Sequence, residues 1–225
     1  MTTASYIFLA GASRGVGREI TKCLTQQPIL GVALLRTEAA RAELEAMGMK
    51  VILGDALNVE AVEHVMLGGE PIHTVISTIG GLPSDGQRAD YLGNKNLIDA
   101  ALKAGAQKFI LVSSIGSGNS AVALPPQALQ TLGPVLVEKE KAEKYLVESG
   151  LTYTIIRPGG LKSEPATGNG ILTEDPRIAG SIHRADVAQL VCRCLNSDRA
   201  NNKILSAVDR NMLYGQPEFE ELLIT

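Results

Sequence analysis

The chain has 225 residues, of which 45% are hydrophobic and 20% are charged, and its net charge is −3 at neutral pH. This length is enough for one large domain with a sizeable core. Basic residues are scattered and no apolar run approaches the roughly 18 residues of a membrane helix. We therefore expect neither nucleic acid nor membrane as a partner. Because an apolar strand begins within the first six residues, we expect no targeting segment and a cytoplasmic protein.

The first two predicted elements are a strand at residues 5–10 and a helix at 15–27, joined by a glycine-rich turn. Gly11, Gly15 and Gly17 give this turn the spacing G-x-x-x-G-x-G. Glycines let the backbone approach a pyrophosphate closely, and the free N–H groups of the new helix point toward it. In this strand–turn–helix context the pattern predicts a dinucleotide site, although an ordinary connection is the alternative.

The second predicted strand, at residues 29–35, ends at Arg36. An NAD-binding protein usually has an acidic residue here, which binds the ribose hydroxyls. Glu38 stands too far into the next helix for that role. Arg36, together with Arg14 in the glycine turn, suits a 2′-phosphate, because guanidinium groups form charge-assisted hydrogen bonds to phosphate. The sequence therefore favours NADP(H) as cofactor; the alternative is that both arginines are solvated surface charges.

The remaining elements alternate along the chain. Further strands are predicted at 50–54, 73–79, 107–113, 151–157 and 203–208, and further helices at 37–48, 58–67, 88–104, 135–149 and 184–196. The strands are short and continuously apolar, as parallel strands buried on both faces are. We therefore predict a single α/β domain over residues 1–225. Its core is a Rossmann-type, doubly wound parallel sheet of about seven strands with helices on both faces, followed by a short C-terminal annex.

Three stretches without clear periodicity, at 80–92, 115–134 and 158–182, each follow a strand. The carboxyl ends of parallel strands meet at one edge of the sheet, where ligands bind. We interpret these stretches as substrate loops, with plain surface connection as the alternative.

Cysteines and histidines give no sign of a metal site. Cys23, Cys192 and Cys194 are odd in number and have no C-x-x-C spacing, so we expect reduced, partly buried thiols. The three histidines are His64, His73 and His183. They are far apart in sequence and have no ligand-type spacing, so we predict no metal.

Several segments together resemble the atypical branch of the short-chain dehydrogenase/reductase superfamily. They include AGASRGVG, VALLRTEA, VILGDALN, LVSSIGSG, TIIRPGGL and HRADVAQLV, and they follow the family order from about residue 5 to 208. That branch contains NmrA-like redox-sensing regulators and biliverdin-IXβ (flavin) reductases. The resemblance is specific for the fold and for a dinucleotide site, and much less specific for a reaction.

The resemblance implies a set of site residues. Cofactor binding would involve Gly11, Ser13, Arg14, Gly15, Val16 and Gly17 at the phosphates, Arg36 and Thr37 at the 2′-phosphate, Asp55 and Ala56 at the adenine, Thr78, Ile79 and Gly80 along the ribose, Ser113 at the end of the fifth strand, Lys139 at the nicotinamide ribose, and Pro158 and Gly159 at the nicotinamide. Ser114 and Lys139 would be the catalytic residues, with Ser114 facing the acceptor.

One departure from the family pattern concerns the proton donor. Active members carry Tyr-x-x-x-Lys on this helix; here Lys139 is present, but Val135 stands at the tyrosine position. Lys139 shares a helical face with Val135, Ala142 and Leu146, where lysine is unusual. The resemblance implies that Lys139 binds the nicotinamide ribose; the alternative is a surface pair with Glu143.

Two functions remain open from the sequence. The first is an NADPH-dependent reductase that passes hydride to a flavin, quinone or tetrapyrrole, which can take its proton from water. The second is a non-enzymatic NADP(H)-binding redox sensor or assembly factor, which the missing tyrosine favours. A nucleotide-sugar epimerase is a weaker reading, because only about 17 residues follow the last strand. The partner is a small-molecule substrate or none, and a homo-oligomer or a protein partner stays open.

Overall fold

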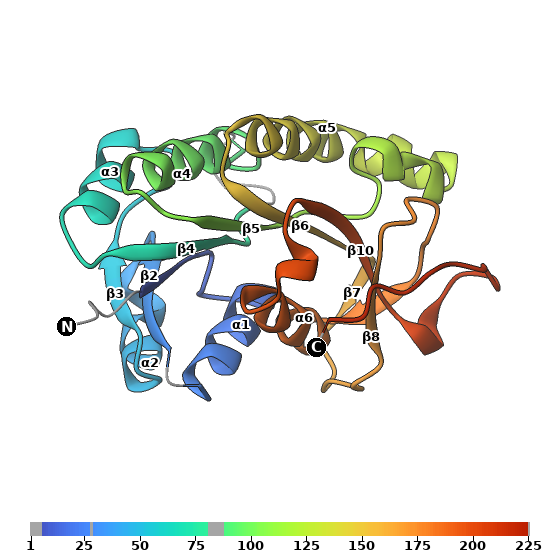
Figure 1. The fold of residues 1–225 in the computed structure, drawn as a ribbon, viewed down its shortest axis with the longest axis horizontal. Coiled ribbons are helices and arrows are strands. Elements are labelled where there is room, and N and C mark those ends of the chain that lie inside the picture. Colours follow the sequence, from blue (N-terminus) through green and yellow to red (C-terminus); the bar gives the residue numbers. More distant parts are fainter. Residues whose placement is uncertain (1–5, 28, 81–87, 225) are drawn as a thin grey trace.

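A computed structural model describes residues 6–27, 29–80 and 88–224. Its main sheet consists of β1 Tyr6–Ala10, β2 Leu30–Leu35, β3 Lys50–Leu53, β4 Ile72–Ser77, β5 Lys108–Val112, β6 Thr152–Pro158, β8 Gly170–Thr173 and β10 Lys203–Asp209. These eight strands lie in the order β3-β2-β1-β4-β5-β6-β10-β8 (Figure 1). All neighbours pair in parallel except β8, which pairs antiparallel with β10 at one edge. Chain order reverses between β1 and β4, where a doubly wound sheet binds its ligand.

Helices cover both faces of this sheet (Figure 1). On one face lie α3 Val59–Leu67, α4 Leu92–Lys103 and α5 Pro126–Glu148; on the other lie α1 Gly15–Thr25, α2 Arg41–Ala46 and α6 Arg184–Leu195. Short 3-10 helices are η1 Glu38–Ala40, η2 Gly118–Ala123, η3 Asp198–Ala200 and η4 Arg210–Met212. Along β1, Phe8 packs in the core under α3, α4 and α5, and Leu9 packs in the core under α1 and α6. Apolar side chains on both faces of one strand require this two-sided cover, so the predicted fold is confirmed.

The predicted loop at 115–134 is wrong in its second half, because α5 begins at Pro126. Gly133 and Pro134 resemble a helix stop, but the helix continues through them and places Leu136 in the core. Proline is favourable in a first turn, as at Pro126, because that N–H has no helical partner. Pro134 does lack its helical hydrogen bond, and packing further along the helix outweighs this local cost.

The predicted loop at 158–182 contains three short strands, so the expectation of about seven strands is also incomplete. β7 Gly160–Lys162 and β9 Ser181–His183 form a parallel two-stranded sheet, and β8 extends the main sheet. Their partners are distant in sequence and the strands have only three or four residues, so local periodicity does not reveal them. Of the predicted loop at 80–92, residues 81–87 lie outside the described residues, and 92 begins α4.

Candidate functional site

The glycine turn between β1 and α1 is held tightly against the end of β4. A Cβ on Gly17 would lie 2.1 Å from the Gly11 carbonyl oxygen, and a Cβ on Gly11 would lie 2.4 Å from Thr78 Oγ1. Gly11 also has a φ of +92°, which L side chains rarely adopt. The Thr78 hydroxyl donates to the Gly11 carbonyl at 3.2 Å, and the Thr78 amide donates to the Ala10 carbonyl at 3.0 Å. The structure therefore uses Thr78 to hold the turn.

Positive charge and free amide groups gather where α1 begins. Arg14 is the N-cap residue; it and Ser13 are exposed, whereas Val16 is buried. The first turn of α1 contains no acidic side chain. The N–H groups of that turn and the positive end of the helix dipole suit an anion here.

The end of β2 offers a second exposed guanidinium. Arg36 and Thr37 directly follow the strand and are exposed. The nearby carboxylate of Glu38 pairs with Arg41, which also contacts Glu45 at 3.3 Å. Within residues 6–27, 29–80 and 88–224, no carboxylate pairs with Arg36 or with Arg14.

The turn after β3 is fixed by the predicted adenine residues. One carboxylate oxygen of Asp55, Oδ1, accepts a hydrogen bond from the Leu57 amide at 2.9 Å. Ala56 is buried, and its carbonyl accepts from the Asn96 side chain at 2.9 Å. Asn96 lies on α4, so this hydrogen bond ties the turn to α4.

A recess lined by the end of β5 and by residues of α4 and α5 contains Lys139. Its Nζ lies 3.2 Å from Oδ1 of Asp90, a fully buried carboxylate, and its side chain is only 18% exposed. A Cβ on Gly80 would lie 3.1 Å from that Nζ and 2.4 Å from Asp90 Oδ1. Asn94 also borders the recess and donates to the Asp90 carbonyl at 2.7 Å. Lys139 therefore points toward the end of β4, where the ribose residues were predicted.

The alternative surface pair between Lys139 and Glu143 is wrong. Glu143 is buried and binds Arg157 of β6, with Oε2–Nη2 at 2.6 Å and Oε1–Nε at 3.1 Å. The same guanidinium donates to Oδ1 of Asn119 in η2 at 2.5 Å. This buried network ties η2, α5 and β6 together.

The two serines after β5 differ in their surroundings. Ser113 lines the recess with Lys139, and its buried hydroxyl has no hydrogen-bond partner among the described residues. The Ser114 hydroxyl donates to the Ile115 carbonyl at 3.0 Å. A buried hydroxyl without a partner is costly, so Ser113 Oγ is available to a ligand.

The predicted nicotinamide residues lie where β6 passes into β7. Pro158 is buried, and its carbonyl accepts from the Ile115 amide at 2.9 Å. A Cβ on Gly159 would lie 2.2 Å from the Gly180 carbonyl oxygen, so this crossing requires glycine.

Ile79, predicted along the ribose, lies half-buried after β4.

Three charged or hydroxyl-bearing side chains at the site were missed from the sequence. Asp90 falls where the predicted loop at 80–92 overlaps the predicted helix at 88–104. Tyr214, whose hydroxyl lies 3.0 Å from Ser181 Oγ, falls in the C-terminal annex. Arg184 begins α6, and its Nε would lie 3.8 Å from a Cβ on Gly15. The segment HRADVAQLV was the available signal for Arg184, which lies more than 160 residues from the glycine turn in sequence.

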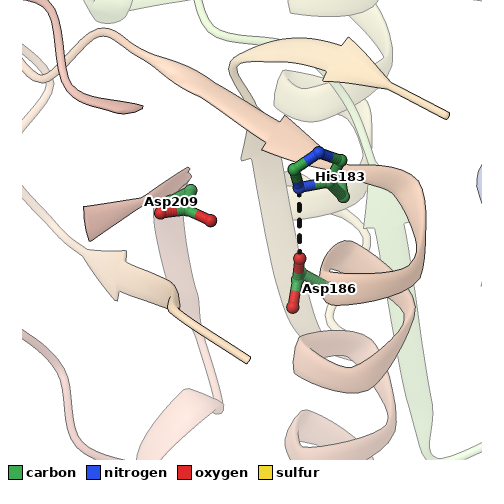
Figure 2. Close-up of side chains that lie close together, drawn as sticks. All are labelled: His183, Asp186 and Asp209. Atoms are coloured by element: carbon green, nitrogen blue, oxygen red, sulfur yellow. Dashed lines mark ion pairs between the residues drawn. The ribbon is translucent and has the colours of Figure 1, made fainter. Parts of the chain in front are cut away.

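His183 lies close to two carboxylates, although the three histidines are far apart in sequence; the prediction that the protein binds no metal stays a prediction. Figure 2 shows His183 beside Asp186 and near Asp209; all three are buried, and one ligand atom of each lies within 4.8 Å of the others. Asp186 accepts hydrogen bonds from the backbone amides of Thr167 and Gly168 at 2.9 and 2.8 Å. In this structure the cluster holds the segment between β7 and β8 against α6.

Residues 11–198 match the model of the NAD(P)H-binding family. The chain belongs to the NAD(P)H-binding family. It is 32% identical to the solved structure of ChuY, an anaerobillin reductase from Escherichia coli O157:H7, with a TM-score of 0.84 over 95% of this chain and 100% of that chain. Curated relatives include the uncharacterized sugar epimerase YhfK of Bacillus subtilis, 34% identical over 88% of this chain and 91% of its own length, and the sanguinarine reductase of Eschscholzia californica, 29% identical over 88% and 86%.

These findings confirm the atypical short-chain dehydrogenase/reductase branch and an oxidoreductase-type NAD(P)H-binding fold. Within the described residues, no helix of this NAD(P)H-binding protein is long and apolar enough to cross a membrane. Relatives from Arabidopsis thaliana are named as chloroplastic proteins, so a cytoplasmic location stays a prediction.

Proposed function

We propose that this protein is an NADPH-dependent reductase that passes hydride to a small conjugated acceptor such as a flavin, a quinone or a linear tetrapyrrole. The observation that carries the proposal is the recess at the end of β5 in which Lys139 pairs with the buried Asp90. This lysine is retained although Val135 replaces the usual proton donor. The likeness to an anaerobillin reductase supports the acceptor class.

The residues present fit a dinucleotide. Gly11 and Gly17 have no side chain that would separate a ligand from the backbone. A Cβ at either position would collide with neighbouring atoms. Arg14 and Arg36 would hold the 2′-phosphate, and the first turn of α1 would hold the diphosphate. Asp55 would bind the adenine amino group through its carboxylate. When bound, NADPH supplies the hydride from its nicotinamide ring.

At the reacting end, this chain would position the ligand and leave proton transfer to water. The Asp90 carboxylate holds the Lys139 ammonium group, which would donate to the nicotinamide ribose hydroxyls. The Ser113 hydroxyl would bind either the ribose or the acceptor edge, and Ser114 would face the acceptor. The Val135 side chain has no proton to donate. Conjugated acceptors that are protonated from solvent therefore suit the site better than simple carbonyls.

A non-enzymatic NADP(H)-responsive sensor or regulatory factor is the second candidate, and Val135 is the observation that favours it. Such a protein would bind the cofactor through the same residues. It would not oxidise NADPH with any acceptor.

The deciding experiment follows NADPH oxidation by the pure protein with flavin, quinone and tetrapyrrole acceptors. We expect turnover with at least one of them, without the pH dependence that a tyrosine–lysine pair produces. We expect Val135→Tyr to add carbonyl reductase activity, with Val137→Tyr, at an exposed position of the same helix, as the matched control. Micromolar cofactor binding without oxidation of NADPH by any acceptor would contradict the reductase and support the sensor.

A further inference from the structure

Helices α1 and α6 lie side by side on one face of the sheet (Figure 1). At their N-terminal ends, Arg184 of α6 approaches Gly15 of α1. Cys23 lies eight residues after Gly15, and Cys192 lies eight residues after Arg184. Both helices rise about 1.5 Å per residue, so the two cysteines are at the same level of the helix pair.

The two cysteines lie at the same helix interface. Cys192 belongs to the apolar core that also contains Ala188, one turn earlier on α6, and Cys23 packs against that core. Cys192 is also the neighbouring side chain with the largest effect on the pKa of Cys23. Alanine and cysteine are small, so the helices can approach closely there. Cys23 is half-buried, whereas Cys192 is only 4% exposed. Cys23 is therefore the more accessible of the two cysteines.

The pKa values of the two thiols also differ, and Cys23, the more accessible residue, has the lower one. The hydrogen bond from Cys192 and, to a lesser extent, the Arg193 guanidinium lower the pKa of Cys23 to about 7, against an opposing effect of burial. The hydrogen bond to Cys23 and burial raise the pKa of Cys192. At neutral pH the accessible sulfur is thus the one with thiolate character, which is the form that reacts with oxidants.

We propose that Cys23 and Cys192 are a redox modification site, at which a hydroperoxide converts the two thiols into an intramolecular disulfide between α1 and α6. The Cys23 thiolate attacks one peroxide oxygen, the O–O bond breaks, and Cys23 becomes a sulfenic acid. The Cys192 thiol then attacks the Cys23 sulfur, so that an S–S bond forms and water leaves. Two electrons pass from the sulfurs to the peroxide, and two thiols and one hydrogen peroxide give one disulfide and two waters.

Cys194 is a built-in control for this site. It lies two residues after Cys192 on α6 and is fully buried, and burial raises its pKa to about 12. Residues two apart on a helix do not share a face, so Cys194 does not point at α1 with Cys192. It should therefore remain a thiol when the other two are oxidised.

The test treats the full-length protein with hydrogen peroxide, quenches it, labels the remaining thiols with a maleimide under denaturing conditions, and measures intact mass. We expect the number of labels to fall from three to one, with the label on Cys194 and one peptide cross-link between Cys23 and Cys192. Dithiothreitol should restore all three labels. Cys194→Ser should fall from two labels to none, with the same cross-link.

Cys23→Ser and Cys192→Ser should form no intramolecular disulfide, and Cys192→Ser should leave Cys23 as a sulfenic acid that a dimedone probe captures. Thermal unfolding checks that each variant is folded, and the wild-type cross-link map does not depend on any variant. Retention of three thiols at a peroxide dose that oxidises free cysteine would overturn the proposal. A cross-link that includes Cys194, or one that forms only between two chains, would also overturn it.

Discussion

The two ends of the site are built in different ways. At the phosphate end, one short segment from β1 to α1 contains Gly11, Arg14 and Gly17, and the end of β4 holds it in place through Thr78. At the reacting end, Asp90, Ser113 and Lys139 come from three separate segments and meet only in the folded chain. The first end thus depends largely on the backbone conformation of one turn, whereas the second end depends on side chains that folding brings together.

This difference predicts that the largest effect follows from adding one methyl group at the phosphate end. Gly17→Ala places a Cβ within 2.1 Å of the Gly11 carbonyl, which must move. We expect the free energy of unfolding to fall by about 1–3 kcal/mol and NADPH binding to be lost. Calorimetric titration and chemical denaturation measure both.

Gly133→Ala is the matched control, because nothing lies within 4 Å of a Cβ there and the residue is inside α5. It should stabilise the protein by about 1 kcal/mol through helix propensity. Normal NADPH affinity in Gly17→Ala would show that the turn is not the phosphate site.

The next largest effect concerns the choice of cofactor. Arg36→Ala should raise the dissociation constant of NADPH roughly 10- to 100-fold, the value of a charge-assisted hydrogen bond, and leave that of NADH nearly unchanged. Arg41→Ala is the control, since Arg41 is engaged by Glu38 and Glu45. Equal affinity of the wild type for NADH and NADPH would break the assignment.

At the reacting end we expect a smaller loss of affinity. Lys139→Met keeps the length of the side chain and removes the ammonium group, so NADPH binding should weaken roughly 10-fold. Asp90→Asn should weaken it in the same direction, because the ammonium group loses its charged partner. Lys141→Met, at an exposed position of α5 paired with Glu138, is the control. Unchanged binding in Lys139→Met would place the ribose elsewhere.

The smallest effect distinguishes the two serines. Ser114→Ala should lower turnover a few-fold without changing cofactor affinity, as the family resemblance implies. Ser113→Ala removes the buried hydroxyl that has no partner among the described residues, and should change turnover or NADPH affinity by a comparable factor. Steady-state kinetics over a range of NADPH concentrations measures kcat and the KM for NADPH of each variant. Wild-type kinetics in both variants would exclude these serines from the site.

The sequence was sufficient for the sheet and the glycine turn because their signals are local. Apolar runs mark the strands, and the glycine spacing of the turn stands in one short segment, where Gly17 packs against the Gly11 carbonyl. It was insufficient where the partner is remote: β8 pairs with β10, and Asp90 pairs with Lys139 some fifty positions away. The continuation of α5 through Pro134 was missed for the same reason, since packing against the sheet outweighs a local break.

The pairing of α1 with α6 also has a consequence for the order in which the chain becomes able to fold during synthesis. Ile20 and Leu24 of α1 share a core with Val187 and Val191 of α6. A ribosome adds roughly 5–20 residues per second, so α6 leaves it on the order of ten seconds or more after α1. During that interval one apolar side of α1 has no partner helix. The nascent protein must complete nearly its whole sheet before the helix that begins at the glycine turn is covered.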